Sequence, residues 1–148
     1  EKARRVERFL SQKYKYSLAR KAFSGPPLDN FLFKQKIGHC EFFSTAMAIM
    51  LRTIGVPTRQ VTGFYSASWN KYGKFYAVRQ SDAHAWTEVW LAGSGWLRID
   101  PTTMVAPDRV ERGLEEAMRG EGSFLENQLF TPRKIAWMNQ LRKQIDSN

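Results

Sequence analysis

Residues 38–57, GHCEFFSTAMAIMLRTIGVP, decide the fold of this 148-residue chain. Nine of the fourteen residues over 41–54 are apolar and lie almost all the way round a helix, and such a helix is buried in a core. Gly55 and Pro57 mark its end, because glycine favours the left-handed C-terminal conformation and proline cannot continue a helix. The sequence therefore predicts one central helix, with Cys40 at its amino end.

The segment before the central helix contains one predicted helix and a loop. Residues 2–13 place apolar side chains at helical spacing among charges, so we expect an amphipathic helix there. Residues 14–18, YKYSL, alternate as a short extended segment does. Residues 24–30, SGPPLDN, are expected to form a loop, because two prolines disfavour regular structure, and Asp29 or Asn30 is suited to capping the element that follows.

The chain after Pro57 has the composition of β-strands. Aromatic and β-branched residues alternate around two turns: WNKYG at 69–73, with Gly73 as the turn residue, and AGSG at 92–95. Two successive hairpins predict a four-stranded antiparallel sheet. Its expected strands are residues 58–68, 74–80, 84–91 and 96–100.

Length and composition point to a single domain. Hydrophobic residues make up 43% and aromatic residues 14% of the chain, far from the composition of a disordered protein. We expect a core over about residues 28–104 and a helical extension over about 106–146, with helices that begin near Pro107 and Pro132. Neither an apolar run of about 18 residues nor a leader is present, so no membrane span or signal peptide is predicted. The first residue, Glu1, suggests a piece of a longer protein.

The chain is strongly basic. A net charge of +9 and a pI of 9.9 would suit nucleic acid, anionic lipid or acidic cell-wall polymers. Much of the charge lies near the two ends, in residues 1–5, 11–21 and 131–144. This distribution favours basic flanks over a reading surface, so no nucleic-acid partner is expected. Residues 133–143 combine basic residues with an apolar stripe, and they can form either a solvated helix face or a membrane-proximal interfacial helix.

Cys40 is the only cysteine, which excludes an internal disulfide and a C-x-x-C pair for zinc or redox exchange. The two histidines, His39 and His84, lack a recognised zinc spacing, so no metal is expected. A lone cysteine on an apolar helix is usually core packing. The alternative, a nucleophile, needs a partner that takes the proton and stabilises the thiolate.

Cys40, His84 and Asp100 have the residue types of a thiol, imidazole and carboxylate triad. His84 and Asp100 lie at the outer ends of the second predicted hairpin, and their side chains meet only if they share a face. A reversal centred on Ala92 places them opposite each other, whereas one centred on residues 93–94 places them on different faces. The triad hypothesis therefore predicts the first register, or a β-bulge that restores agreement. The alternative is a structural strand pair in which Asp100 closes a turn.

His39 is adjacent to Cys40 in sequence, but successive side chains on a helix diverge by about 100°. We therefore expect His39 to be a poor base, and to act as a cleft wall or as a charge that lowers the pKa of the thiol. On this hypothesis His39→Phe leaves most activity intact, whereas His84→Ala abolishes it.

Three motifs occur in one order: GHC at 38–40, HAW at 84–86 and DPT at 100–102. Together with their spacing, they resemble the transglutaminase-like superfamily, whose pattern is G-x-C at a helix start, H-A-W at a strand start and D-P-T after a later strand. The resemblance covers about residues 31–103. The flanking segments are similar to the bacterial, TgpA-type branch of periplasmic, membrane-anchored proteins.

The resemblance implies an α+β, papain-like fold in which a central helix packs on an antiparallel β-sheet, with helical flanks at both ends. It implies Cys40 as the nucleophile, His84 as the base and Asp100 as the carboxylate that orients the base. The implied location is the periplasmic domain of an inner-membrane protein. No metal or organic cofactor is implied.

The implied reaction is thiol-dependent acyl transfer from an amide of a protein or peptide, of the protein-glutamine gamma-glutamyltransferase type, through a cysteine thioester. Two alternatives stay open: a cysteine peptidase or amidase that uses water as acceptor, and a non-catalytic cell-envelope scaffold. In the catalytic case the Cys40 backbone N–H would hold the oxyanion. Gln35 and the indole N–H of Trp69 are the candidates for a second donor.

Overall fold

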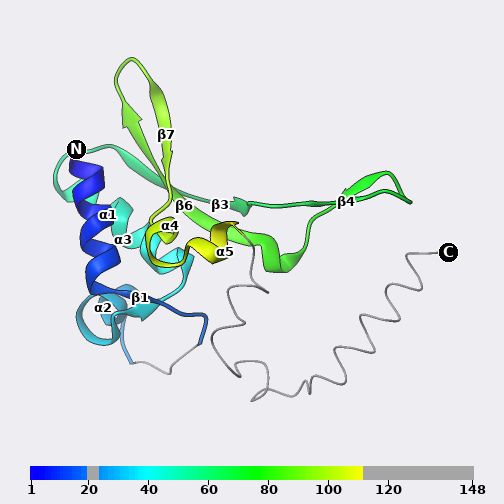
Figure 1. Ribbon diagram of the computed structural model, residues 1–148. Coiled ribbons are helices and arrows are strands. Elements are labelled where there is room, and N and C mark those ends of the chain that lie inside the picture. Colours follow the sequence, from blue (N-terminus) through cyan, green and yellow to red (C-terminus); the bar gives the residue numbers. More distant parts are fainter. Residues whose placement is uncertain (20–23, 112–148) are drawn as a thin grey trace.

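The computed structural model describes residues 1–19 and 24–111 of the chain (Figure 1). The helix predicted near Pro132 and most of the predicted extension lie outside the described residues. The helices and helical turns are α1 (Lys2–Lys13), α2 (Pro27–Asp29), the π-helical turn η1 (Asn30–Gln35), α3 (Cys40–Thr53), the 3-10 turn η2 (Gln80–Asp82), α4 (Thr102–Val105) and α5 (Pro107–Glu111). The strands are β1 (Lys15–Tyr16), β2 (Ile37–Gly38), β3 (Thr58–Phe64), β4 (Ser68–Asn70), β5 (Phe75–Ala77), β6 (Ala83–Leu91) and β7 (Gly95–Ile99).

α3 is the central helix, and it begins and ends within one residue of the predicted range 41–54. Half of its side chains are buried, fewer than predicted for a helix that is apolar almost all the way round, because one side of the helix, with Ile49, faces solvent. Its carboxyl end is closed by two backbone hydrogen bonds, from Gly55 to Arg52 at 3.1 Å and from Val56 to Leu51 at 2.9 Å. Gly55 has a φ of +75°, a conformation that glycine adopts without strain, so the predicted end of the helix is confirmed.

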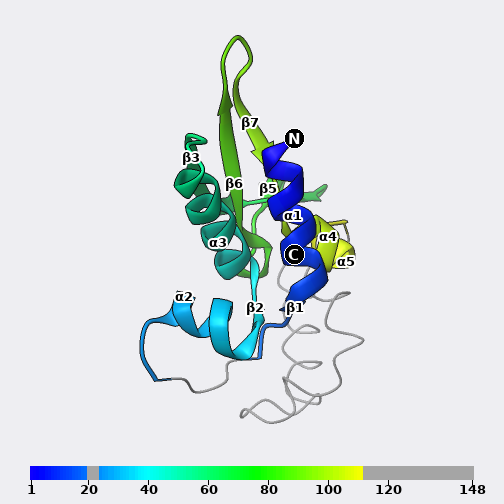
Figure 2. The same ribbon diagram turned by 90° about the vertical axis from the view of Figure 1, so that its left-hand side faces the viewer.

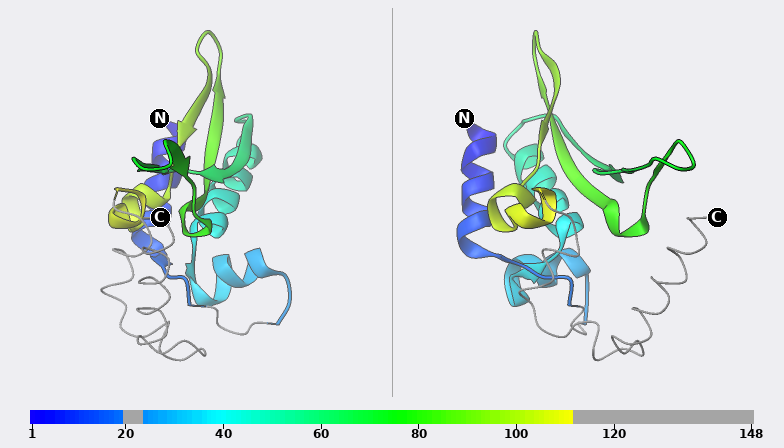
Figure 3. Two further views of the ribbon diagram at one scale, coloured as in Figure 1. Left: turned by 90° about the vertical axis from the view of Figure 1, so that its right-hand side faces the viewer. Right: turned by 45° about the vertical axis from the view of Figure 1, so that its right-hand side comes forward.

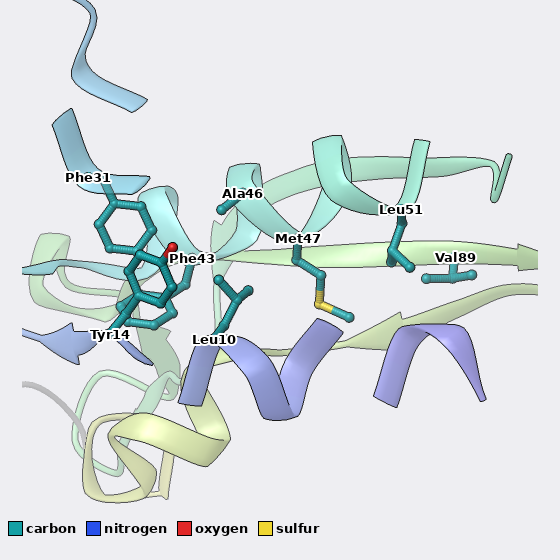
Figure 4. Close-up of a cluster of buried hydrophobic side chains, with 8 residues drawn as sticks. All are labelled: Leu10, Tyr14, Phe31, Phe43, Ala46, Met47, Leu51 and Val89. Carbon is teal, nitrogen blue, oxygen red and sulfur yellow. The ribbon is translucent and has the colours of Figure 1, made fainter. Parts of the chain in front are cut away.

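The hydrophobic core lies between α1, α3 and the main sheet. α1 occupies the range predicted from the sequence and contributes the fully buried Leu10. Figure 4 shows this side chain against Met47 of α3, with Val89 of β6 beside Leu51. The buried cluster comprises Leu10, Tyr14, Phe31, Phe43, Ala46, Met47, Leu51 and Val89. This packing fixes α3 between α1 and β6, and with it the position of Cys40.

The main sheet has three antiparallel strands in the order β3-β6-β7, rather than the four that we predicted. β3 pairs with β6 over its whole length, from Thr58 opposite Val89 to Phe64 opposite Ala83. β6 buries alternate side chains against α3, and β3 also contacts α3 on this face of the sheet. The first predicted hairpin is therefore present only as the short pair of β4 and β5, because most of its expected first strand, residues 58–64, pairs instead with β6.

β4 and β5 form a separate hairpin that extends away from the body (Figure 1, Figure 3). Where the chain leaves and rejoins the main sheet, the Tyr65 N–H donates to the Asp82 carbonyl at 3.2 Å. In the turn, the Asn70 side-chain oxygen accepts the backbone N–H groups of Tyr72 and Gly73. Both strands have only three residues, and their aromatic side chains, Trp69, Phe75 and Tyr76, are at least half exposed, so this hairpin is not packed into the core.

The segment before α3 surrounds the amino end of that helix. β1 and β2 form a short parallel pair, and α2 and η1 lie near the start of α3 (Figure 2). The predicted loop is confirmed for residues 24–26 and wrong for residues 27–30, because Pro27 occupies the first position of α2, where proline is tolerated. Neither predicted cap is present: Asp29 makes no capping hydrogen bond, and Asn30 is a helical residue with a buried side chain.

Two short helices follow β7. α4 was not predicted from the sequence, and it lies against α1 (Figure 3). α5 begins at Pro107 with Asp108 in its first turn, as the sequence predicts. Among the helices of residues 1–19 and 24–111, none has the length and apolar character that crossing a bilayer requires.

Replacing Phe43 by alanine should lower the free energy of unfolding by about 3–5 kcal/mol, because the loss of a fully buried aromatic ring leaves a cavity in the core. Phe33→Ala is the matched control: Phe33 is 75% exposed, so its loss should change stability by less than about 0.5 kcal/mol. Urea unfolding followed by tryptophan fluorescence measures both. Equal effects at the two positions would contradict the core described above.

Candidate active site

His84 and Asp100 share a face of the β6–β7 hairpin through a register that we did not predict. The ladder continues without a bulge to Leu91 opposite Gly95, so the reversal is centred on Gly93. Continued past the end of β7, this register offsets His84 from Asp100 by two residues, which keeps both side chains on one face. Both registers considered from the sequence were therefore wrong. His84 and Asp100 still share a face of the hairpin, as diagonal rather than directly opposite neighbours.

The His84 ring and the Asp100 carboxylate are in direct contact. Nε2–H donates to Oδ2 at 2.7 Å, since an ionised carboxylate only accepts, and both side chains are buried. The other carboxylate oxygen, Oδ1, accepts the backbone N–H of Thr102 at 3.1 Å. Asp100 therefore does both things considered from the sequence: one carboxylate oxygen closes the turn and the other contacts His84.

Cys40 is the first residue of α3 and is buried. Its thiol lies within hydrogen-bonding reach of the side chains of His39 and His84 and of the backbone N–H of Ala85. Burial raises the pKa of the thiol, but these three groups outweigh burial and lower the pKa to about 6. The positive end of the α3 dipole favours the same thiolate.

The pKa of His84 shifts in the opposite direction to that of Cys40. Burial lowers the pKa of its imidazole, but hydrogen bonds and charge from Asp100 and Cys40 outweigh burial and raise the pKa to about 9. Between about pH 6 and about pH 9 the stable form is thus a thiolate beside an imidazolium. His84 Nδ1 is buried without a hydrogen bond of standard geometry among the described residues, so it is the ring nitrogen available to the thiol.

The Asp100 carboxylate is held in its ionised form. Burial raises its pKa, but His84, the Thr102 N–H and Arg98 together hold the pKa below its usual range. Arg98 Nη2 donates to Oδ2 at 3.2 Å, and the guanidinium lies 4.3 Å from the centre of a Trp86 ring. Trp86 in turn stacks 6.4 Å from the His84 ring. Arg98 was missed in the sequence, although strand alternation places it on the face of Asp100.

His39 contacts the thiol, although the helical-spacing argument predicted that it would diverge. It is the N-cap of α3 and has an extended backbone, with φ −104° and ψ −174°, so helical spacing does not apply to it. Its ring packs edge-on against Phe42, with centroids 5.0 Å apart. The expected effect on the pKa of the thiol agrees with this contact. That His39 is not the base stays a prediction.

Gly38 explains the glycine of the G-x-C motif. A Cβ at this position would lie 2.9 Å from the Phe31 ring, which is closer than real Cβ atoms approach, and 3.0 Å from Phe42, which is tighter than most real Cβ contacts. Glycine therefore lets β2 pass close to these two side chains and lead directly into α3. The motif reflects the packing that positions Cys40.

The two candidates for a second oxyanion donor lie in different places. Gln35 is the last residue of η1 and lines a cavity that His39 also lines. Trp69 is exposed on β4, packed on Tyr76 in the hairpin that extends away from the body (Figure 1). By position, Gln35 is the better candidate.

The described residues do not offer a metal site. Within residues 1–19 and 24–111, no three His, Cys, Asp or Glu side chains cluster closely enough to hold an ion. Instead, His84 lies between the other two residues: it hydrogen-bonds Asp100 and interacts with the Cys40 thiol. That the chemistry needs no metal or organic cofactor stays a prediction.

These elements define the class of the protein as α+β and papain-like. A central helix carries a thiol at its amino end, and the antiparallel sheet against which it packs positions an imidazole and a carboxylate. The model of the family described as the transglutaminase-like superfamily matches residues 1–101. The chain belongs to this superfamily, as its three motifs predicted.

Its relatives include named enzymes. The chain is 39% identical over 145 residues to "Protein-glutamine gamma-glutamyltransferase" of Pseudomonas aeruginosa, which covers 96% of this chain and 22% of that protein. It is 42% identical over 79 residues to the uncharacterized protein YebA of Bacillus subtilis, covering 51% of this chain and 11% of YebA. The crystal structure of the periplasmic domain of TgpA from Pseudomonas aeruginosa matches with a TM-score of 0.65 at 39% identity, over 76% of this chain and 41% of that one. The chain thus spans about a fifth of the transferase.

Alkylation of Cys40 by iodoacetamide should rise with pH and reach half of its plateau near pH 6, because the thiolate forms as the pH passes the lowered pKa of the thiol. His84→Ala should move this midpoint upward, towards the value of about 8.5 for a free thiol, because it removes the imidazolium that stabilises the thiolate. Rates measured by mass spectrometry between pH 4 and pH 10 test both.

His39→Phe is the comparison variant in the same titration. It should move the midpoint upward by less than His84→Ala does, because one hydrogen-bonding group is lost while the imidazolium of His84 remains. A His84→Ala midpoint equal to that of the wild type would show that the thiol and the His84 ring are not coupled.

Proposed function

We propose that this domain performs thiol-dependent acyl transfer on the side-chain amide of a glutamine in a protein or peptide, with Cys40 as nucleophile, His84 as base and Asp100 as orienting carboxylate. The observation that carries the proposal is the 2.7 Å contact between buried His84 and Asp100, beside a thiol whose pKa is lowered to about 6. A thiol that only filled the core would have its pKa raised by burial. Similarity to a protein named as a glutamine gamma-glutamyltransferase supports the same reaction.

In the first step, the Cys40 thiolate attacks the carbonyl carbon of the amide and forms the C–S bond. The oxyanion accepts hydrogen bonds from the Cys40 backbone N–H, which has no intrahelical partner at the first position of α3, and from the Gln35 side chain. His84 gives its Nδ1 proton to the departing nitrogen, the C–N bond breaks and ammonia leaves. The product is a thioester on Cys40.

In the second step, an amine attacks the thioester carbonyl while the neutral His84 ring takes a proton from it. The new C–N bond forms as the C–S bond breaks, which restores the thiolate and the imidazolium. Asp100 holds Nε2–H throughout, so Nδ1 remains available for each proton transfer. Water in place of the amine gives glutamate by the same path.

We also infer that the domain works in the periplasm as part of a membrane-anchored protein. The support is its similarity to the periplasmic domain of TgpA. Protease added to spheroplasts that express the full-length protein should degrade the domain while a cytoplasmic marker survives. Protection of the domain would contradict this location.

Incubating the domain with a glutamine peptide and a labelled primary amine should give a product heavier by the amine minus ammonia. Cys40→Ala should reduce this product by about 10³-fold or more, because it removes the nucleophile. Ammonia release without incorporation would support an amidase, and cleavage of the peptide backbone would support a peptidase. If neither occurs and Cys40 reacts with iodoacetamide no faster than free cysteine, the domain is a scaffold.

Asp100→Ala should lower kcat by about 10²–10⁴-fold, because the His84 ring loses the partner that fixes its tautomer. The pKa of His84 should fall without the carboxylate, so the imidazolium is lost at lower pH and the alkaline limb of the pH–rate profile should shift downward. Arg98→Ala is the control, since it removes one bond to Asp100 and should cost less than about tenfold. Equal losses in both variants would show that Asp100 does not act through His84.

A further inference from the structure

A cavity of about 840 Å³ adjoins the amino end of α3. It lies among the first turn of α3, α2, η1 and the segment after β1, on the side where Figure 2 shows α2 near α3. His39 and Glu41, which precede and follow Cys40, both line it. A cavity of this size can hold a small ligand or the side chain of a bound peptide.

The walls of this cavity are mainly apolar. Leu28, Phe31, Ile37 and Phe42 contribute apolar side chains. Phe31 belongs to the buried core, and its ring packs 5.4 Å from that of Phe42, so these walls are held by the fold itself. Apolar walls that are already ordered favour an apolar occupant, because its burial stabilises the complex without a cost for ordering the protein.

Asn30 is the polar exception in the wall. Only 6% of this residue is exposed, and its Oδ1 has no hydrogen-bond partner among the described residues. A buried amide oxygen without a partner destabilises a folded protein. The amide can turn about its last side-chain bond and pair with a peptide group through either its oxygen or its NH₂. The wall thus holds a buried polar group beside an apolar surface, and pairing with a peptide group requires this turn of the amide.

We propose that this cavity binds an apolar residue, of the size of leucine or phenylalanine, next to the reactive glutamine of the acyl donor, and that Asn30 hydrogen-bonds the peptide group of that residue. The proposal rests on the proposed function, because it takes Cys40 as the nucleophile. Glu41 in the wall adds a charge preference, since its carboxylate repels an acidic residue at the same position. The cavity therefore selects glutamines by their neighbour in sequence.

The test uses peptides that react with Cys40 without turnover. In acetyl-X-Gln-Gly-amide and acetyl-Gly-Gln-X-amide, a chloromethyl ketone replaces the side-chain amide of the glutamine, and X is leucine, serine or glutamate. The thiolate forms a C–S bond as chloride leaves, and mass spectrometry of the intact protein gives the rate. Leucine should react about tenfold or more faster than serine at one of the two positions, with glutamate slowest. Leucine and serine rates within about twofold at both positions would overturn the proposal.

A matched pair of variants ties this preference to the cavity. Thr45 lines the cavity, so Thr45→Phe should fill it and bring the ratio of leucine to serine rates close to one. Thr53→Phe makes the same replacement at the far end of α3 and should leave the ratio unchanged. Leu28→Ala should also lower the ratio, because it removes part of the apolar wall without requiring the fold to accept a larger side chain. A ratio unchanged in both Thr45→Phe and Leu28→Ala would overturn the assignment.

Asn30→Leu separates binding from structure. If the unpaired amide serves the substrate, this variant should raise Tm by about 2 °C or more while slowing all of the peptides about tenfold, with the leucine preference kept. A lower Tm with unchanged rates would make Asn30 structural and overturn its part of the proposal.

The two proposals fail in different assays. Selective alkylation by leucine peptides without amine incorporation would retain the cavity and reject acyl transfer to amines. Amine incorporation that is indifferent to the neighbour of glutamine would retain the reaction and reject the cavity.

Discussion

The position of the Cys40 thiol depends on how α3 is held against the main sheet. Two buried threonines hold it: Thr87 Oγ1 donates to the Ser44 carbonyl at 3.0 Å, and Thr58 Oγ1 donates to the Ala48 carbonyl at 2.9 Å. These bonds are directional and shielded from water, so they fix the register of the helix on the sheet more narrowly than apolar contact alone. Because the first bond lies about one helical turn from the thiol and three residues from the imidazole, it sets how these two groups approach.

Burial and pairing oppose each other at every group of the site. Burial disfavours the charged forms of Cys40, His84 and Asp100, yet each keeps its charge because an opposite charge or a hydrogen-bond donor faces it. The three groups are therefore interdependent, and the loss of one leaves a buried charge without compensation. Arg98 supports the set from the solvent side by sharing Oδ2 of Asp100 with the His84 ring.

Local features of the fold could be predicted from the sequence, whereas pairing between distant segments could not. The ends of α1 and α3 follow from apolar spacing and from Gly55, which act within a few residues. The hairpin register depends on a turn in which the Ser94 N–H donates to Leu91, with Gly93 and Gly95 at φ +81° and +79°, and the letters AGSG do not specify that geometry. The strand count failed because β3 pairs with β6 and not with its neighbour in sequence. At the site, the motifs identified residues that lie together, but the contact of the N-cap histidine with the thiol depends on backbone angles at a helix boundary.

The lowered pKa of the Cys40 thiol also makes this residue reactive towards oxidants. A thiolate is the form that peroxides attack, first to a sulfenic acid and then irreversibly to sulfinic and sulfonic acids. Enzymes with a second, nearby cysteine stop this sequence at its first stage by forming a disulfide, but this chain has a single cysteine. Burial restricts access to the sulfur without supplying such a partner. Reduction of an oxidised Cys40 therefore requires a thiol from another molecule. How long the site keeps its free thiol then depends on the reductants in its surroundings.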